Sequence, residues 1–157
     1  MNNSKPVLLG IAFVCIALLG VALYLQHFQD MLPCPLCVIQ RYAFAVVALI
    51  CLVTAFLPRG ATKPGAILAA LASLAGAGVA GWHIYIKANP TVSCGIDPLE
   101  TSLNTIPTAQ LFPFLFQADG LCTTEYAPIF GLSLPQWALF WFAVMAIVLL
   151  RLALRRR

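Results

Sequence analysis

The chain has 157 residues, of which 62% are hydrophobic and only 9% are charged, and its formal net charge is +4 at pH 7. This composition is too apolar for an ordinary soluble domain, and it predicts a single integral membrane domain over residues 1–157. The basic excess indicates membrane topology and does not support nucleic-acid binding, since the arginine run at residues 155–157 is best explained as an anchor for the last helix.

Four apolar stretches follow one another along the chain, and each approaches the ~20 residues that a helix needs to cross a bilayer. They cover residues 7–25, 36–57, 65–86 and 135–154. The first has no small-x-small cleavage pattern before the polar segment that follows it, so we interpret it as a retained helix and not as a signal peptide. The sequence therefore predicts an all-α membrane protein, a four-transmembrane-helix bundle with a short outer loop at about residues 26–35 and a long one at about residues 87–134.

The basic residues indicate the orientation of these helices. If the four helices alternate in direction, Lys5, Arg59, Lys63, Arg151 and the terminal arginine run fall on one side. Cytoplasmic loops carry the excess of Lys and Arg in membrane proteins. Both termini are therefore predicted to be cytoplasmic, and both outer loops face the opposite side.

Part of the long outer loop is itself strongly apolar. Phe112, Phe114 and Phe116 alternate around Pro113 in a segment that is too short and too broken to span a bilayer. These rings can either insert into the membrane interface or pack against the helix bundle, and the sequence leaves both placements open.

The six cysteines divide between loops and helices. Four fall in the outer loops or at their edge, where an oxidising compartment can reach them: Cys34, Cys37, Cys94 and Cys122. Cys15 and Cys51 lie inside predicted helices and are most simply small hydrophobic residues.

Cys34-Pro35-Leu36-Cys37 sits where a polar loop turns into an apolar helix. Unpaired N–H groups and the helix dipole stabilise a thiolate in a first helical turn, so we expect a reachable thiol of low pKa there. The absence of a histidine after Cys37 excludes c-type haem attachment. A four-thiolate zinc site is disfavoured because Cys94 and Cys122 are far apart in the sequence, and no metal is predicted.

Two structural disulfides, Cys34 to Cys37 and Cys94 to Cys122, are one interpretation of the four outer cysteines. A ring closed over four residues constrains the unfolded chain very little, so the first pair is a poor staple and a good exchanger. A loop pair and a membrane-edge pair can instead relay electrons by thiolate attack through a mixed disulfide. A relay that ends at the membrane surface indicates a lipid-soluble two-electron acceptor, that is, a quinone.

Arg41 is the candidate binding residue for that acceptor. It lies one helical turn after Cys37, and a cation inside a membrane is costly enough to mark a functional candidate. Arg41 can stabilise both the Cys37 thiolate and the negative charge that develops on a quinone ring. An arginine that only extends its head to the membrane surface is the other interpretation of this position.

Together these motifs resemble the DsbB family of bacterial disulfide bond formation proteins, and the resemblance extends over nearly the whole chain. The motifs are Gln26-His27, Pro33-Cys34-Pro35-Leu36-Cys37 with Arg41, a single Cys94, a single Cys122, and Gly131-Leu132-Ser133-Leu134-Pro135-Gln136-Trp137. The resemblance implies a protein-dithiol:quinone oxidoreductase of the bacterial inner membrane with its redox loops in the periplasm. It also implies ubiquinone as the cofactor, or menaquinone without oxygen, and a thioredoxin-like thiol oxidase of the DsbA type as the partner.

The resemblance implies a role for each outer cysteine. The reduced partner attacks Cys94 and forms a mixed disulfide, and Cys122 is released to attack Cys34. Cys37 then faces the quinone, with Arg41 beside the ring.

Two further positions bear on the family resemblance. His83, near the outer end of the third predicted helix, matches a family histidine close to the quinone site, although a histidine at a helix end is as well explained as an interfacial residue. Pro35 is a departure, because family members vary at this position, and it is expected to shift the redox poise of the Cys34 and Cys37 pair.

Three other interpretations fit part of the same pattern. A related branch of the family serves one dedicated client, and the sequence does not discriminate it. The vitamin K epoxide reductase type of thiol–quinone protein has its Cys-x-x-Cys late in the chain, whereas here the motif opens the second helix. A membrane scaffold with structural disulfides predicts outer cysteines that stay oxidised whatever the quinone supply.

Overall fold

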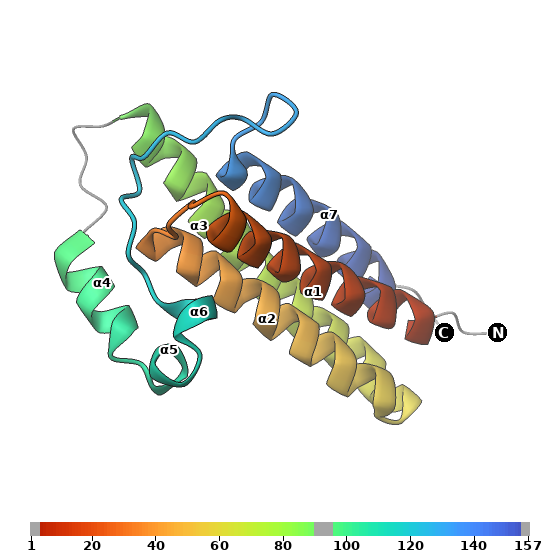
Figure 1. Cartoon of the computed structure of the whole chain (residues 1–157). Helices are drawn as coiled ribbons and strands as arrows, with labels where there is room; N and C mark the ends of the chain where they lie inside the picture. Colours follow the sequence, from red (N-terminus) through yellow and green to blue (C-terminus); the bar gives the residue numbers. More distant parts are fainter. Residues whose placement is uncertain (1–3, 90–95, 155–157) are drawn as a thin grey trace.

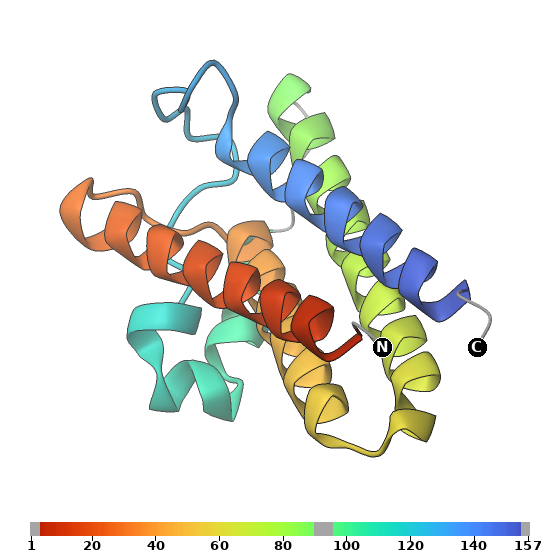
Figure 2. The same ribbon diagram turned by 90° about the vertical axis from the view of Figure 1, so that its right-hand side faces the viewer.

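The computed structural model describes residues 4–89 and 96–154. In this part of the chain, four helices are long and apolar enough to cross a membrane. They are α1 (Ser4–Phe28), α2 (Pro35–Phe56), α3 (Thr62–Ala88) and α7 (Leu134–Leu154). They pack as a bundle in which α1 begins and α7 ends at the same end (Figure 1 and Figure 2). The predicted all-α, four-helix membrane bundle is thus confirmed, and each helix begins and ends within three residues of the predicted positions.

The two ends of α2 show why the chain changes direction there. Cys34 takes an extended backbone conformation, with φ −77° and ψ 164°, and acts as the N-cap, while Pro35 occupies the first helical position, where no backbone N–H is needed. At the other end, Leu57 is extended and precedes Pro58, which disfavours a further helical turn. The short 3₁₀ turn η1 (Arg59–Ala61) then leads into α3, so α2 and α3 pack as antiparallel neighbours.

The core of the bundle combines small residues on α3 with larger ones on its neighbours. α3 packs most extensively on α7, and α2 packs on both α3 and α1. Gly76 lies so close to the ring of Phe142 that an added Cβ would come within 2.5 Å of it. Phe142 in turn stacks on Phe44, with 4.0 Å between the ring centroids. Cys15 and Cys51 are fully buried in this core, as expected of small hydrophobic residues.

The long second loop adds three short helices beside α2 (Figure 1): α4 (Ile96–Asn104), α5 (Pro107–Leu111) and α6 (Pro113–Phe116). Tyr42 of α2 holds them, because its ring stacks on Phe116 at 4.1 Å between centroids and its hydroxyl oxygen lies 2.7 Å from that of Thr108. Phe116 is buried, whereas Phe112 and Phe114 are each 49% exposed. One of the three rings therefore packs on the bundle, and the other two stay on the surface.

After α6 the chain returns to α7 across the start of α2. Asn104 and Ala118 fix the beginning of this return segment through two hydrogen bonds of 3.0 and 2.9 Å. The backbone N–H groups of Asp119 and Gly120 both donate to the carbonyl oxygen of Pro33, at 3.1 Å each. The return segment is thereby fastened to the loop that leads into α2.

Candidate functional site

Two cysteines meet in the first turn of α2. The Sγ atoms of Cys34 and Cys37 lie 2.9 Å apart, and the backbone N–H of Cys37 donates to Cys34 Sγ at 3.3 Å. This follows from the spacing, because the side chain of an N-cap residue faces the backbone N–H groups of the second and third helical residues. The pair is placed to interconvert between a dithiol and a disulfide.

The return segment brings a third cysteine to this pair. Cys122 is 1% exposed and packs in one hydrophobic cluster with Cys34 and Cys37. Gly120 allows this close approach, since a Cβ there would collide with the carbonyl oxygen of Leu32. Three cysteines from two distant parts of the chain therefore form one group, which we call the sulfur cluster.

Cys34 is the central member of the sulfur cluster, and its pKa is raised above the ordinary cysteine value. The largest cause is a hydrogen bond with the side chain of Cys122, followed by the hydrogen bond with Cys37 and by burial. Only 2% of Cys34 is exposed. The expectation of a reachable, low-pKa thiol therefore fails for Cys34, because the overlying segment shields the sulfur and its hydrogen bonds favour the protonated thiol.

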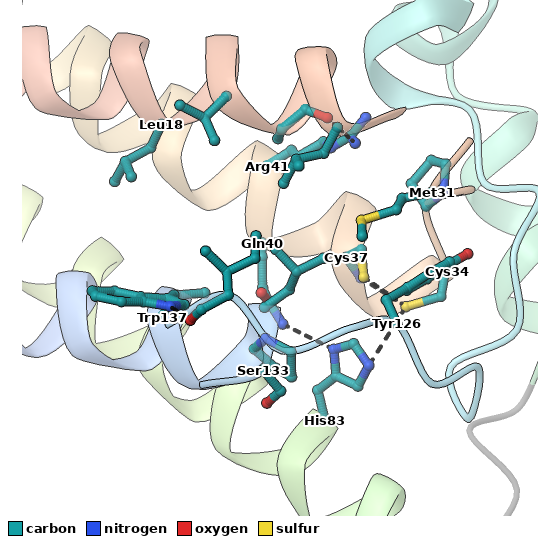
Figure 3. Close-up of a pocket in the computed structure, with 18 of the residues that line it drawn as sticks. Leu18, Met31, Cys34, Cys37, Gln40, Arg41, His83, Tyr126, Ser133 and Trp137 are labelled. Atoms are coloured by element: carbon teal, nitrogen blue, oxygen red, sulfur yellow. Dashed lines mark hydrogen bonds between the residues drawn. The ribbon is translucent and has the colours of Figure 1, made fainter. Parts of the chain in front are cut away.

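His83 and Gln40 form the polar side of the sulfur cluster (Figure 3). His83 is 3% exposed, and its Nε2 atom lies 3.2 Å from the carbonyl oxygen of Cys122 and 3.7 Å from Cys34 Sγ. Because a carbonyl oxygen only accepts, we assign the proton of the neutral ring to Nε2. Nδ1 then accepts from the Gln40 amide nitrogen, 3.3 Å away. This arrangement directs an N–H donor toward the sulfur cluster.

Arg41 is buried one turn beyond Cys37, with 7% of its surface exposed. Its guanidinium donates to Gln26 Oε1 at 2.7 Å, to the carbonyl oxygen of Leu115 at 2.9 Å and to that of Ala22 at 3.4 Å. The side chain thus joins α2 to α1 and α6 instead of extending to the protein surface.

A cavity of about 320 Å³ lies beside the sulfur cluster. Its polar wall includes Cys37, Gln40 and Arg41, and its apolar walls come mainly from α1, α7 and the segment before α7, including Leu18 and Trp141. Pockets of about 300–1,000 Å³ with apolar walls and a few converging polar groups are typical of small-molecule sites. The cavity therefore has the size and the lining of a small-molecule site that borders the Cys37 thiol.

The cavity brings together five of the six residues that the sequence predicted for the site: Cys34, Cys37, Arg41, His83 and Cys122. The sixth, Cys94, lies outside the described residues. Sequence reasoning missed Gln40 as the partner of His83 and Gln26 as the partner of Arg41. The available signal for Gln40 was a second polar residue adjoining Arg41 inside an apolar helix.

Comparisons with known proteins show the family of the chain. The family model described as "Disulfide bond formation protein DsbB" matches residues 4–152. The chain is 74% identical to disulfide bond formation protein B of Herminiimonas arsenicoxydans, over 100% of this chain and 99% of the relative. It is 43% identical to the protein of the same name in Ralstonia nicotianae, over 98% of this chain and 96% of the relative. Identity to disulfide bond formation protein B 1 of Pseudomonas fluorescens is 46%, over 96% of this chain and 89% of the relative. The chain therefore belongs to the DsbB family of disulfide bond formation proteins.

Proposed function

We propose that the chain oxidises a periplasmic thioredoxin-like thiol oxidase of the DsbA type and passes the two electrons to membrane quinone, as a protein-dithiol:quinone oxidoreductase. Family membership supports the role in disulfide bond formation. The observation that carries the finer proposal is the continuity of the sulfur cluster: Cys122 is hydrogen-bonded to Cys34, Cys34 contacts Cys37, and Cys37 borders the cavity.

The exchange starts from two disulfides, Cys94–Cys122 and Cys34–Cys37. A thiolate of the reduced partner attacks Cys94, so a mixed disulfide forms and Cys122 leaves as a thiolate. Cys122 then attacks Cys34; the Cys122–Cys34 bond forms, the Cys34–Cys37 bond breaks, and Cys37 leaves as a thiolate.

The second half of the exchange releases the partner. Its other thiolate attacks the mixed disulfide, which completes the partner's disulfide and frees Cys94. Cys94 then attacks Cys122 and expels Cys34, so the Cys94–Cys122 disulfide is restored. The two electrons from the partner now reside on Cys34 and Cys37 as a dithiol.

A quinone supplies the terminal oxidation, since it accepts two electrons and two protons as it becomes a quinol. We propose ubiquinone, or menaquinone without oxygen, and the apolar cavity beside Cys37 supports this choice. Cys37 offers its electron pair toward the cavity, and Cys34 closes the disulfide. Arg41, held by three hydrogen bonds, presents a fixed positive charge there, and such preorganised charge stabilises developing negative charge efficiently.

His83 and Gln40 assist at Cys34. Each time Cys34 leaves a disulfide, negative charge develops on its sulfur, and the Nε2–H group of His83 is 3.7 Å away. A donor to a thiolate stabilises the charged form, and the hydrogen bond from Gln40 keeps the proton on Nε2. Gln40 therefore acts as a positioning residue for His83.

We further propose that the protein spans the bacterial inner membrane with both termini in the cytoplasm and both redox loops in the periplasm. The asymmetric distribution of Lys and Arg supports this orientation. The sulfur cluster lies at the end of the bundle where α2 and α7 begin, opposite to the end where α1 begins (Figure 1). An exchange partner in the periplasm then meets the redox loops without crossing the bilayer.

The test is quinone reduction by the purified protein in detergent, supplied with a reduced DsbA-type oxidase and either a ubiquinone or a menaquinone analogue. Wild type and Cys51→Ala, which removes a core cysteine, are expected to reduce quinone, whereas Cys37→Ala is expected to be inactive. If all three proteins were equally inert with both quinones and with several thioredoxin-like partners, the relay would be wrong and the scaffold interpretation would replace it. Activity with one partner alone would identify the dedicated branch.

A further inference from the structure

We propose that the reduced site binds one divalent cation of the zinc class through Cys34 Sγ, Cys37 Sγ and His83 Nε2, and that the bound ion withholds both thiols from oxidation. The inference rests on the proposed function only in that these are the two thiols that quinone oxidises. Sequence spacing argued against a site of four loop thiolates. The ligand set inferred here is different, because its nitrogen ligand is His83 of α3. No local sequence motif indicates that His83 lies beside Cys34 and Cys37.

The three ligand atoms already lie near the positions that zinc requires. Among the described residues, Cys34, Cys37 and His83 bring their ligand atoms within 4.8 Å of one another. Tetrahedral bonds of about 2.3 Å to sulfur and about 2.0–2.1 Å to nitrogen separate two sulfur ligands by about 3.8 Å, and sulfur from nitrogen by about 3.6 Å. The distance from Cys34 Sγ to His83 Nε2 is 3.7 Å, which fits without adjustment.

One adjustment is needed between the two sulfurs. They lie 2.9 Å apart and must open by roughly 0.9 Å to share a tetrahedral ion. Cys37 is only partly buried and borders the cavity, so its side chain has room to turn. All three ligand residues line that cavity, which leaves the fourth position of the ion for water, as in zinc sites with three protein ligands.

Charge balance favours the bound form at this buried place. Cys34 and His83 are 2% and 3% exposed, so an unpaired ion would be costly here. Two thiolates cancel the charge of a divalent cation, and a neutral imidazole adds none. The complex therefore carries no net charge and avoids most of the desolvation cost of an isolated ion.

Gln40 gives the inference a specific test. Without metal, the carbonyl partner of Nε2 assigns the proton of His83 to that nitrogen, and the Gln40 amide then donates to Nδ1. Metal binding at Nε2 moves this proton to Nδ1, so Gln40 must turn its amide until Oε1 accepts it. A carboxylate accepts without turning and is a common partner of zinc-bound histidines. Gln40→Glu is thus expected to tighten metal binding, and Gln40→Leu to weaken it by about 10- to 100-fold.

Binding exchanges protons and no electrons. Each thiol loses its proton as its bond to the metal forms, while the imidazole only shifts its proton between nitrogens, so one bound ion releases two protons. Formation of the Cys34–Cys37 disulfide removes both thiolate ligands. The cation therefore binds the dithiol and not the disulfide, and by thermodynamic linkage it holds the pair reduced.

The experiment uses the full-length protein in detergent, reduced with a phosphine, freed of reductant and titrated with Co²⁺. Cobalt replaces zinc in tetrahedral thiolate sites and reports thiolate ligation through its visible absorption. We expect one Co²⁺ per chain, displacement by Zn²⁺, release of two protons, and loss of binding after diamide has closed the disulfide. His83→Ala should weaken Co²⁺ binding by at least about tenfold. Cys51→Ala and His27→Ala remove the same residue types elsewhere and should bind like wild type.

Three results would overturn the inference: no thiolate absorption in the reduced wild type, full affinity in His83→Ala, or binding that survives diamide. The Gln40 variants and the oxidised wild type keep the test valid if His83→Ala does not fold. None of these measurements requires turnover. If the protein binds Co²⁺ as expected but reduces no quinone, the metal site stands and the proposed function is refuted. If it reduces quinone but binds no Co²⁺, the proposed function stands and the metal site is refuted.

Discussion

Gly120 determines how closely Cys122 approaches Cys34, and its replacement by alanine tests that positioning directly. The Gly120 N–H donates to the Pro33 carbonyl oxygen at 3.1 Å, and an added Cβ would overlap with the carbonyl oxygen of Leu32. Since the obstacle is backbone, no side-chain rotation relieves the overlap, and the return segment itself must shift. A misplacement of about 1 Å costs on the order of 100-fold in the rate of a positioned reaction.

We therefore expect Gly120→Ala to slow partner oxidation by roughly 10- to 100-fold. Single-turnover quinone reduction by the fully reduced protein uses only Cys34 and Cys37, so it should keep the wild-type rate. Stopped-flow absorbance of the quinone measures both reactions. Gly60→Ala is the matched control, because its Cβ meets nothing within 4 Å.

Two outcomes would refute this reasoning about Gly120. Partner oxidation by Gly120→Ala at the rate of Gly60→Ala would mean that the return segment does not need its observed contact with the first loop. An equal loss in both the partner and the single-turnover reactions would mean that the substitution damages the Cys34 and Cys37 pair itself.

Arg41→Lys keeps a positive charge but cannot reproduce the 2.7 Å bond to Gln26 together with the other two bonds. Because an unsatisfied buried acceptor costs about 1–3 kcal/mol, the melting temperature of this variant in detergent should fall. An unchanged melting temperature would contradict the role of Arg41 in joining the helices. The hydrogen bond with Cys122 raises the pKa of Cys34, so Cys122→Ala should lower that pKa. The pH profile of Cys34 alkylation in the reduced protein, measured by mass spectrometry, should then move to lower pH. An unchanged profile would mean that the hydrogen bond has no effect on the Cys34 thiol. Gly76→Ala places a methyl group 2.5 Å from the ring of Phe142 and should destabilise the bundle by about 1–3 kcal/mol. Thermal unfolding measures this change. A variant as stable as wild type would show that the contact between α3 and α7 is looser than described.

The four membrane helices could be predicted because their signals are local. Each is a continuous apolar run, and the turn between α2 and α3 carries Pro58 and Gly60 next to the helix ends. The start of α2 could be predicted equally well, since a helix tolerates proline in its first turn and is disrupted by proline in its interior. These features can be recognised without knowing which helices pack against each other.

The docking of the second loop was not predictable, because its contacts join residues far apart in the chain. The hydroxyls of Tyr42 and Thr108 meet across 66 positions, and Arg41 bonds to Leu115 across 74. Sequence left the placement of Phe116 open, and only the position of Tyr42 decides it. The same holds for His83, whose approach to Cys34 spans 49 positions.

Cys34 shows how a correct local argument can give the wrong environment. A helix start does favour a thiolate. At this helix start, however, the return segment buries the sulfur and Cys122 supplies a hydrogen bond that raises the pKa of Cys34. The local effect was foreseen, and the opposing effect depends on a segment more than 80 residues away in the sequence.

Direct exchange between Cys122 and Cys34 is the central claim, and disulfide mapping of Cys37→Ala tests it most directly. The protein is oxidised, free thiols are trapped by alkylation, and the peptides are identified by mass spectrometry with and without the reduced partner. Because this variant holds one disulfide among its three remaining outer cysteines, we predict a Cys34–Cys122 disulfide with Cys94 released as a thiol. An intact Cys94–Cys122 disulfide beside an alkylated Cys34, even with the partner present, would contradict the relay.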